Sequence, residues 1–172
     1  QLEAFVAHFG RAPSHIDGHH HVQQLPGVRD LVVDLAKRVG NGRIWVRSGT
    51  VSPSLARRRG VATAKALVIG ALGGGIARRA LAAGVPVNRG FSGAYDFAAD
   101  HGPVADLFLR FVIGARENTL VMCHPGHSDE TLRKLDVMTS ARDAELRYLS
   151  SPEWEALLRA RALDLGPYRR PD

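Results

Sequence analysis

The chain has 172 residues, of which 45% are hydrophobic and 23% charged, a composition typical of one globular domain that excludes a disordered chain. Its formal net charge of +6 comes from twenty arginines against three lysines, dispersed without interleaved aromatic residues, so nucleic acid is not an expected partner. The single cysteine excludes an internal disulfide framework, and no segment has the length and apolarity of a membrane span, so no membrane association and a cytoplasmic location are expected.

Hydrophobic periodicity alternates between helical and strand patterns along the chain. Helices are predicted over residues 1–9, 28–39, 54–72, 76–83, 104–113, 141–149 and 154–162, and strands over residues 14–17, 43–47, 85–88 and 119–123. The triplet Gly73, Gly74 and Gly75 is predicted to break the two central helices apart. This alternation predicts an α/β fold with a parallel sheet and right-handed crossovers. A complete (β/α) barrel has eight strands and takes about 250 residues, so we expect a small open sheet or part of a TIM-like barrel.

The first residues have the pattern of the end of an amphipathic helix. Apolar side chains recur there at helical spacing, and neither an initiator methionine nor an N-capping residue precedes them. We therefore expect residues 1–172 to form a single domain that is incomplete at its N-terminus.

Histidines concentrate immediately after the first predicted strand. Four of the eight fall within residues 15–21, together with one carboxylate. If the strand continues, alternation places four of these side chains on one face: His15, Asp17, His19 and His21. Imidazole and carboxylate together suit zinc or a similar divalent ion, with further ligands coming from elsewhere in the structure. The alternative is a solvated histidine-rich turn, or histidines that are hydrogen-bonded to backbone carbonyls.

A second candidate region lies between the third strand and the next helix. Gly90 and Gly93 indicate a loop that lets the backbone approach a ligand, with Ser92 and Tyr95 as the polar groups that bind substrate. The alternative is an ordinary connection between a strand and a helix.

A third polar cluster follows the most hydrophobic strand of the chain. Neighbours on a strand point to opposite faces, so we expect Cys123 in the core and His124 at the mouth of the fold. A histidine there can protonate a leaving group or accept a proton from it. The alternative is that His124 is hydrogen-bonded to the backbone of a loop.

Several of these motifs resemble the YdjC-like carbohydrate deacetylases, which include the chitooligosaccharide deacetylases. The likeness begins in the run from Phe9 to Val22, with Pro13, His15, Ile16, Asp17 and the histidine triplet. It recurs in Gly90-Phe91-Ser92 with Tyr95, in Met122-Cys123-His124-Pro125, and in a leucine–serine pattern near residues 146–158. These matches follow the order of the family over nearly the whole chain.

The resemblance implies a (β/α) barrel that uses a divalent metal, magnesium or zinc, to remove N-acetyl groups from amino-sugar oligosaccharides. It implies that His19, the first histidine of the triplet, is a metal ligand. His124 would be the general acid, and Asp17 would be either an acid–base group or a hydrogen-bonding support for His19. His21, with Ser92 and Tyr95, is assigned to substrate binding.

Two departures from the family pattern affect this interpretation. The N-terminal Asp-Asp motif and a second metal histidine are absent, and Gln23 stands where many members carry another histidine. We therefore predict that the parent protein is a deacetylase and that this chain alone is weakly active or inactive. Whether a second copy completes the fold as a homodimer is left open.

Two other functions fit part of the sequence. An amidohydrolase-type metal hydrolase also carries a His-x-His motif at the end of its first strand, although too few residues follow the motif here. A non-catalytic basic binding module would account for the arginine excess and the missing ligands. Such a module would purify without a stoichiometric divalent ion.

Overall fold

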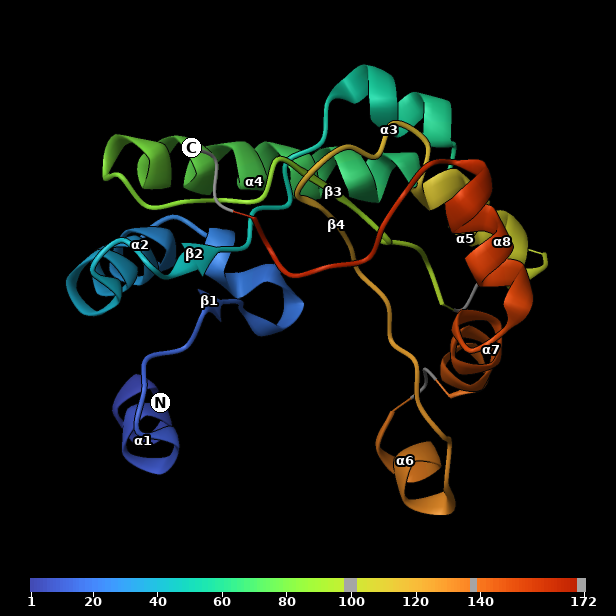
Figure 1. Ribbon diagram of the computed structural model, residues 1–172, viewed down its shortest axis with the longest axis horizontal. Coiled ribbons are helices and arrows are strands. Elements are labelled where there is room, and N and C mark those ends of the chain that lie inside the picture. The colour runs from blue at the N-terminus through green and yellow to red at the C-terminus, as the bar shows by residue number, and fades with distance from the viewer. Residues whose placement is uncertain (98–101, 137–138, 170–172) are drawn as a thin grey trace.

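The computed structural model describes residues 1–97, 102–136 and 139–169 (Figure 1). Four short strands alternate with helices, which confirms the predicted α/β class. The strands are β1 (His15–Ile16), β2 (Trp45–Val46), β3 (Gly90–Ser92) and β4 (Thr119–Val121). The helices are α1 (Leu2–Phe9), the 3-10 helix η1 (His19–Gln24), α2 (Val28–Gly40), α3 (Pro53–Arg59), α4 (Thr63–Ala82), α5 (Val104–Phe111), α6 (Glu130–Leu135), α7 (Ser140–Leu149) and α8 (Pro152–Ala160).

All strand pairing is parallel and follows chain order. β1 pairs with β2, β3 pairs with β4, and an isolated parallel bridge between Val46 and Val87 joins the two pairs. These pairings among the described residues do not form a closed barrel. Because all four strands run in the same direction, the residues that follow them lie at one edge of the sheet.

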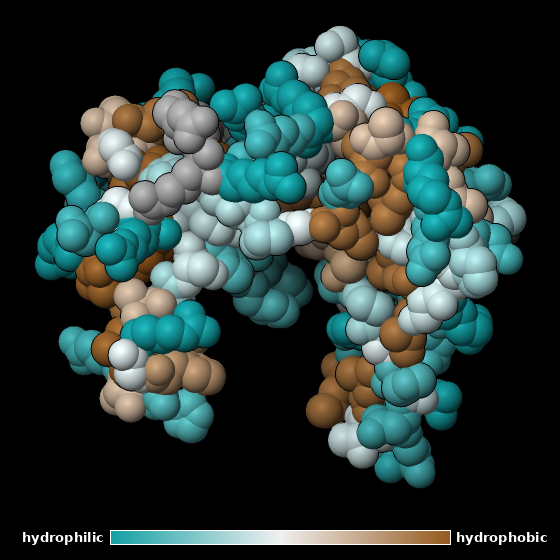
Figure 2. All heavy atoms as spheres, in the orientation of Figure 1, coloured by the Kyte–Doolittle hydropathy of each residue, from teal (hydrophilic) through white to brown (hydrophobic). Residues whose placement is uncertain are grey.

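Three apolar clusters hold the helices against the strands, one of which packs Ile69 of α4 against Phe91 of β3. The first packs Val33 and Ala36 of α2 and Ile76 of α4 against Ile44 and Val46. The second joins α5, α7 and α8 through aromatic side chains, with buried residues that include Phe108, Phe111 and Trp154. Figure 1 shows α1 and α6 projecting from the same side of this body, and Figure 2 shows the hollow between them.

The predicted break at the glycine triplet is wrong, because α4 runs without interruption through all three residues. The break lies earlier, where Gly60 ends α3 in the left-handed conformation at φ 63°. Gly73 instead permits close packing: a Cβ there would lie 2.5 Å from the Thr50 nitrogen and 2.6 Å from the Gly49 carbonyl carbon. Helix α4 therefore crosses the backbone of Gly49 and Thr50 at this point. Glycines occur both at such close crossings and at helix ends, so their number alone does not tell the two apart.

The third strand also differs from its predicted position. Residues 85–88 form only the bridge at Val87, and the strand lies at Gly90–Ser92, in the segment that we expected to be a loop. Between them, the Asn88 side chain accepts a hydrogen bond from the Ser48 nitrogen at 2.7 Å and donates one to the Ser48 oxygen at 2.8 Å. A side-chain amide thus takes the place of backbone pairing where β2 ends.

Helix α7 is tied to the ends of two strands by one buried carboxylate. Glu145, 1% exposed, accepts a hydrogen bond from the Tyr95 hydroxyl at 2.7 Å and another from the His124 backbone nitrogen. Burial and this hydrogen bond raise the pKa of Tyr95, so its hydroxyl remains a donor at neutral pH. The loops after β3 and β4 are therefore held at a common point.

No helix in the described ranges combines the length and the apolar character that crossing a membrane requires.

The packing of α4 predicts opposite effects for two neighbouring glycines. Gly73→Ala should lower the free energy of unfolding by about 1–3 kcal/mol, because the methyl group meets backbone that cannot rotate away. Gly74→Ala is the matched control: its Cβ would meet only the Arg78 side chain at 3.5 Å, so the lower chain entropy should stabilise the protein by about 0.5–1 kcal/mol. Denaturant unfolding measures both, and equal effects would contradict the packing described for α4.

Because the Glu145 carboxylate accepts a hydrogen bond from Tyr95, we expect the loss of the hydroxyl group to affect stability differently at two tyrosines. Tyr95→Phe removes a hydrogen-bond donor from a buried oxygen and should lower the free energy of unfolding by about 1–3 kcal/mol. Tyr148→Phe serves as the control, since that hydroxyl has no partner among the described residues, and should change stability by less than about 0.5 kcal/mol. The free energy of unfolding is measured in urea. Equal stability of the two variants would contradict the buried hydrogen bond between Tyr95 and Glu145.

Candidate functional site

The carboxyl edge of the sheet collects the polar residues that follow each strand. Asp17 follows β1, Arg47 follows β2, and His124 lies three residues beyond β4. The two halves of this edge adjoin, because the His21 ring packs against Phe91 of β3 and the loop after β3 carries Phe97, against which the His124 ring packs. The groups predicted from three separate motifs therefore lie along one edge of the sheet.

Lys65 is itself held between the loops of this edge. Its ammonium group donates to the Tyr95 carbonyl at 2.9 Å and lies 5.6 Å from the centre of the Phe97 ring. The His124 ring packs edge-on against the same Phe97, with their centroids 5.1 Å apart. Lys65 and His124 therefore contact the same aromatic side chain.

Arg47 organises the first half of the site. Its side chain is 4% exposed, and Nε donates to Asp17 Oδ1 at 2.5 Å. Nη1 lies 2.8 Å from His21 Nδ1, and Nη2 donates to the Gly18 carbonyl at 3.2 Å. One guanidinium thus fixes the carboxylate, the imidazole and the backbone turn between them.

The predicted alternation of the histidines on one strand face is wrong. β1 ends at Ile16 and η1 begins at His19, with His20 and His21 at positive φ values of 51° and 64°. Asp17 and His21 meet through Arg47 rather than through a shared strand face. The predicted metal ligand, His19, is exposed and stacks on His20 with ring centroids 3.9 Å apart.

Two glutamines anchor η1 to the segment after β2. Gln23 is buried and donates to the Arg47 carbonyl at 3.1 Å. Gln24 is also buried and accepts a hydrogen bond from the Gly49 nitrogen at 2.6 Å. The Gln23 side chain therefore supports the backbone of Arg47.

Burial keeps both histidines of the site uncharged at neutral pH. It lowers the pKa of His21 to about 4, and the adjacent Arg47 guanidinium acts in the same direction. Burial also lowers the pKa of His124, although the Glu145 carboxylate opposes this effect. His124 Nδ1 is buried without a hydrogen-bond partner in the described part of the chain.

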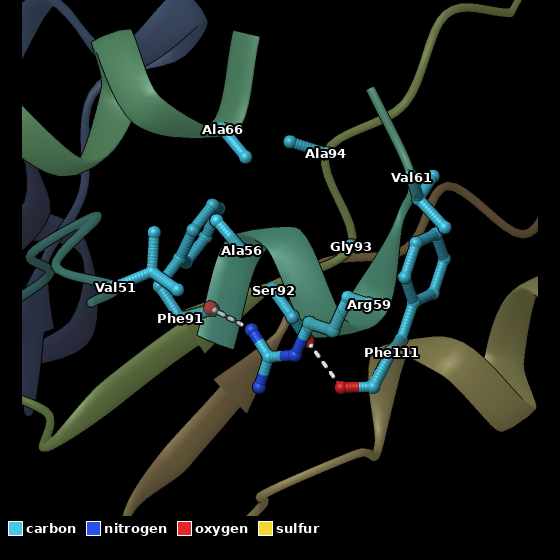
Figure 3. A pocket seen from close by; sticks show the side chains of 10 residues that line it. All are labelled: Val51, Ala56, Arg59, Val61, Ala66, Phe91, Ser92, Gly93, Ala94 and Phe111. Carbon is cyan, nitrogen blue, oxygen red and sulfur yellow. Dashed lines mark hydrogen bonds between the residues drawn. The ribbon is translucent and has the colours of Figure 1, made fainter. Parts of the chain in front are cut away.

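Ser92 and Tyr95, predicted to bind substrate, have their hydroxyl groups engaged within the protein. Ser92 donates to the Phe111 carbonyl at 2.9 Å (Figure 3), and Tyr95 donates to Glu145. The adjacent cavity of about 20 Å³, lined by Phe91 and by the Arg59 side chain, has room for a water molecule and not for a sugar. Substrate binding by these two hydroxyl groups remains a prediction.

Cys123 is exposed, so its predicted place in the core is wrong. The strand pairing ends at Val121, and the chain has left the sheet before the cysteine. The alternation of side chains along a strand therefore does not apply to Cys123 and does not predict which way its side chain points.

The residues of this site do not complete a metal centre by themselves. In residues 1–97, 102–136 and 139–169, no three His, Cys, Asp or Glu side chains form a group able to hold a metal ion. Asp17 is paired with Arg47, and the His19 ring stacks on His20.

Sequence reasoning missed Arg47, Lys65 and Glu145. Arg47 was detectable, because it is the last residue of a predicted strand, at the edge where such folds place functional groups. Glu145 and Lys65 lie on helices whose charged residues resemble an ordinary solvated face, so the sequence carries no comparable signal for them.

Comparisons with known proteins place these motifs in one family. The family model described as YdjC-like protein matches residues 1–160. A chitooligosaccharide deacetylase of Enterobacter sp. (strain 638) is 29% identical over 98% of this chain and 57% of its own length. A carbohydrate deacetylase of Geobacillus stearothermophilus is 30% identical over 98% of this chain and 56% of its own length.

A further relative has a higher sequence identity over a shorter segment. A chitooligosaccharide deacetylase of Yersinia pestis (strain Pestoides F) is 54% identical over 37 residues, which are 22% of this chain and 15% of that protein. The chain thus spans little more than half of the curated relatives that it matches along its whole length. The match over residues 1–160 establishes that the chain belongs to the YdjC-like family.

Proposed function

We propose that this chain contributes the site of a metal-dependent hydrolase that removes N-acetyl groups from amino-sugar oligosaccharides. The observation that carries the proposal is that Asp17, His21 and His124 all follow strands of one parallel sheet, with His21 packed against Phe91 of β3 and His124 against Phe97 in the loop after β3. The named activities of relatives matched over 98% of the chain give the substrate class. The order of the strands, from β1 to β4, is the order expected for part of a (β/α) barrel.

The reaction adds water across an amide bond and yields acetate and a free amine. His124 is the proposed proton carrier, because its lowered pKa leaves the ring neutral at pH 7 and able to take up a proton. It then delivers this proton to the sugar nitrogen as the carbon–nitrogen bond breaks. Glu145 holds the His124 backbone in place through its hydrogen bond to the amide nitrogen.

The other two residues, Asp17 and His21, lie in the segment that follows β1. Asp17 has its Oδ1 atom held by Arg47, and its exposed carboxylate supports the turn that leads to His19. His21 is proposed to bind the substrate. Both residues are oriented by the same guanidinium, so they keep a fixed relation to each other.

A divalent ion, zinc or magnesium, remains part of the proposal, with His19 as one ligand. The described residues do not supply a group of three ligands, so the remaining ligands have to come from outside them. We assign no step of the reaction to the ion.

His124→Gln should lower the rate of acetate release from N-acetylated oligosaccharides by about 100-fold or more, because it removes the proton carrier. His127→Gln is the matched control, since His127 lies exposed in the same segment and should leave the rate unchanged. Acetate release is measured for this chain and for a version extended at its N-terminus, with saturating divalent ion. If the extended protein releases no acetate from any amino sugar, the proposed function is wrong.

Metal content separates the proposal from a binding module. The extended protein should purify with, or take up, a stoichiometric divalent ion, and His19→Ala should lower its occupancy, as measured by elemental analysis. His20→Ala, in the neighbouring exposed ring, is the control and should retain the ion. Retention of the ion by His19→Ala would exclude His19 as a ligand.

A further inference from the structure

The hydrogen-bonding state of His21 follows from the chemistry of its neighbour. A guanidinium carries only N–H donors and no acceptor. Since Arg47 Nη1 lies 2.8 Å from His21 Nδ1, the arginine must donate and the imidazole nitrogen must accept. An accepting Nδ1 carries no proton, so the proton of the neutral ring lies on Nε2.

The surroundings of the ring keep it in this orientation. His21 packs edge-on against Phe91 with the centroids 5.7 Å apart, and the Arg47 guanidinium lies 5.3 Å from the centre of the same ring. Arg47 cannot turn away without leaving Asp17 and Gly18, which accept its other two hydrogen bonds. A ring flip would bring a carbon atom in place of Nδ1 and leave a buried donor without an acceptor.

The second nitrogen of the ring is free to meet a ligand. Nε2 has no partner in the described part of the chain, and it is not one of the buried polar atoms without a partner, so it reaches solvent. Its N–H therefore points a hydrogen-bond donor out of a half-buried ring. This proton also leaves the nitrogen without a lone pair for a metal ion.

We propose that Arg47 is a positioning residue that holds His21 as the neutral Nε2–H tautomer, so that His21 donates a hydrogen bond to an oxygen of the substrate. The recognised group is an acceptor oxygen, either the acetyl carbonyl or a sugar hydroxyl. The role of His21 is thereby distinct from that of His19, which needs an unprotonated nitrogen to bind an ion. The assignment of this oxygen to an amino sugar rests on the proposed function.

The tautomer is measurable without substrate, by long-range ¹H–¹⁵N correlation spectra of the imidazole groups in the 172-residue chain at pH 7. His21→Gln identifies the signals of His21. The expected spectrum has a protonated, pyrrole-type Nε2 and an unprotonated, pyridine-type Nδ1. A protonated Nδ1 would overturn the proposal.

Two arginine variants test whether Arg47 is the cause. Arg47→Met keeps the length of the side chain but removes its donors, and it should shift the His21 nitrogens toward a mixture of tautomers. Arg47→Lys retains one charged donor and should restore the wild-type pattern in part. Arg79→Met is the control, because Arg79 pairs with Asp30 and Asp34 on the surface and should leave His21 unchanged. An unchanged spectrum in a folded Arg47→Met chain would also overturn the proposal.

The substrate contact has a separate readout in the N-terminally extended protein. Adding N,N′-diacetylchitobiose should shift the His21 Nε2 and its proton, and Arg47→Met should raise KM more than it lowers kcat. If the sugar binds and the Nε2 signal does not move, the donor role is wrong. If no acetate is released by any variant while the tautomer is as expected, the proposed function fails and the tautomer assignment stands.

Discussion

A buried guanidinium cannot do without acceptors, and this requirement shapes the site. Arg47 is 3% exposed and its charge is balanced by Asp17, while His21 and Gly18 accept its remaining hydrogen bonds. Asp17 and Gly18 lie between β1 and η1, and His21 lies within η1, so the arginine that follows β2 determines where the histidine triplet turns. The non-helical backbone of His20 and His21 is tolerated because Arg47, Gln23 and Gln24 fix both ends of the turn.

A carboxylate has the corresponding role on the other side of the site. Glu145 has both oxygens occupied, one by the Tyr95 hydroxyl and one by the His124 amide, so α7 fixes the loops that follow β3 and β4. Lys65 donates to the Tyr95 carbonyl and lies over the Phe97 ring, which the His124 ring also contacts. The site thus consists of two imidazoles that burial keeps neutral. The buried cation Arg47 positions His21, and the buried anion Glu145 positions the backbone of His124.

The sequence predicted the alternation of strands and helices and the family. Ser151 as the cap of α8 was also predictable, because its side chain accepts a hydrogen bond from the Trp154 nitrogen. The error at Gly73 arose because a helix that crosses a backbone and a helix that ends both use glycine. The error at the histidine triplet arose because strand alternation was extended across Gly18, after which the backbone turns. Glu145 forms its hydrogen bonds with residues that are far away in the sequence, and the local hydrophobic pattern does not reveal such partners.

The central claim is that His21 and His124 face one acetylated sugar from the two halves of a single site. The most direct test is a crystal structure of the N-terminally extended protein with a bound N-acetylated oligosaccharide. The account predicts an acetyl group at the carboxyl edge of the sheet, with a substrate oxygen within hydrogen-bonding distance of His21 Nε2 and the amide nitrogen close to His124. A sugar bound away from this edge, or with its acetyl group out of reach of both imidazoles, would contradict it.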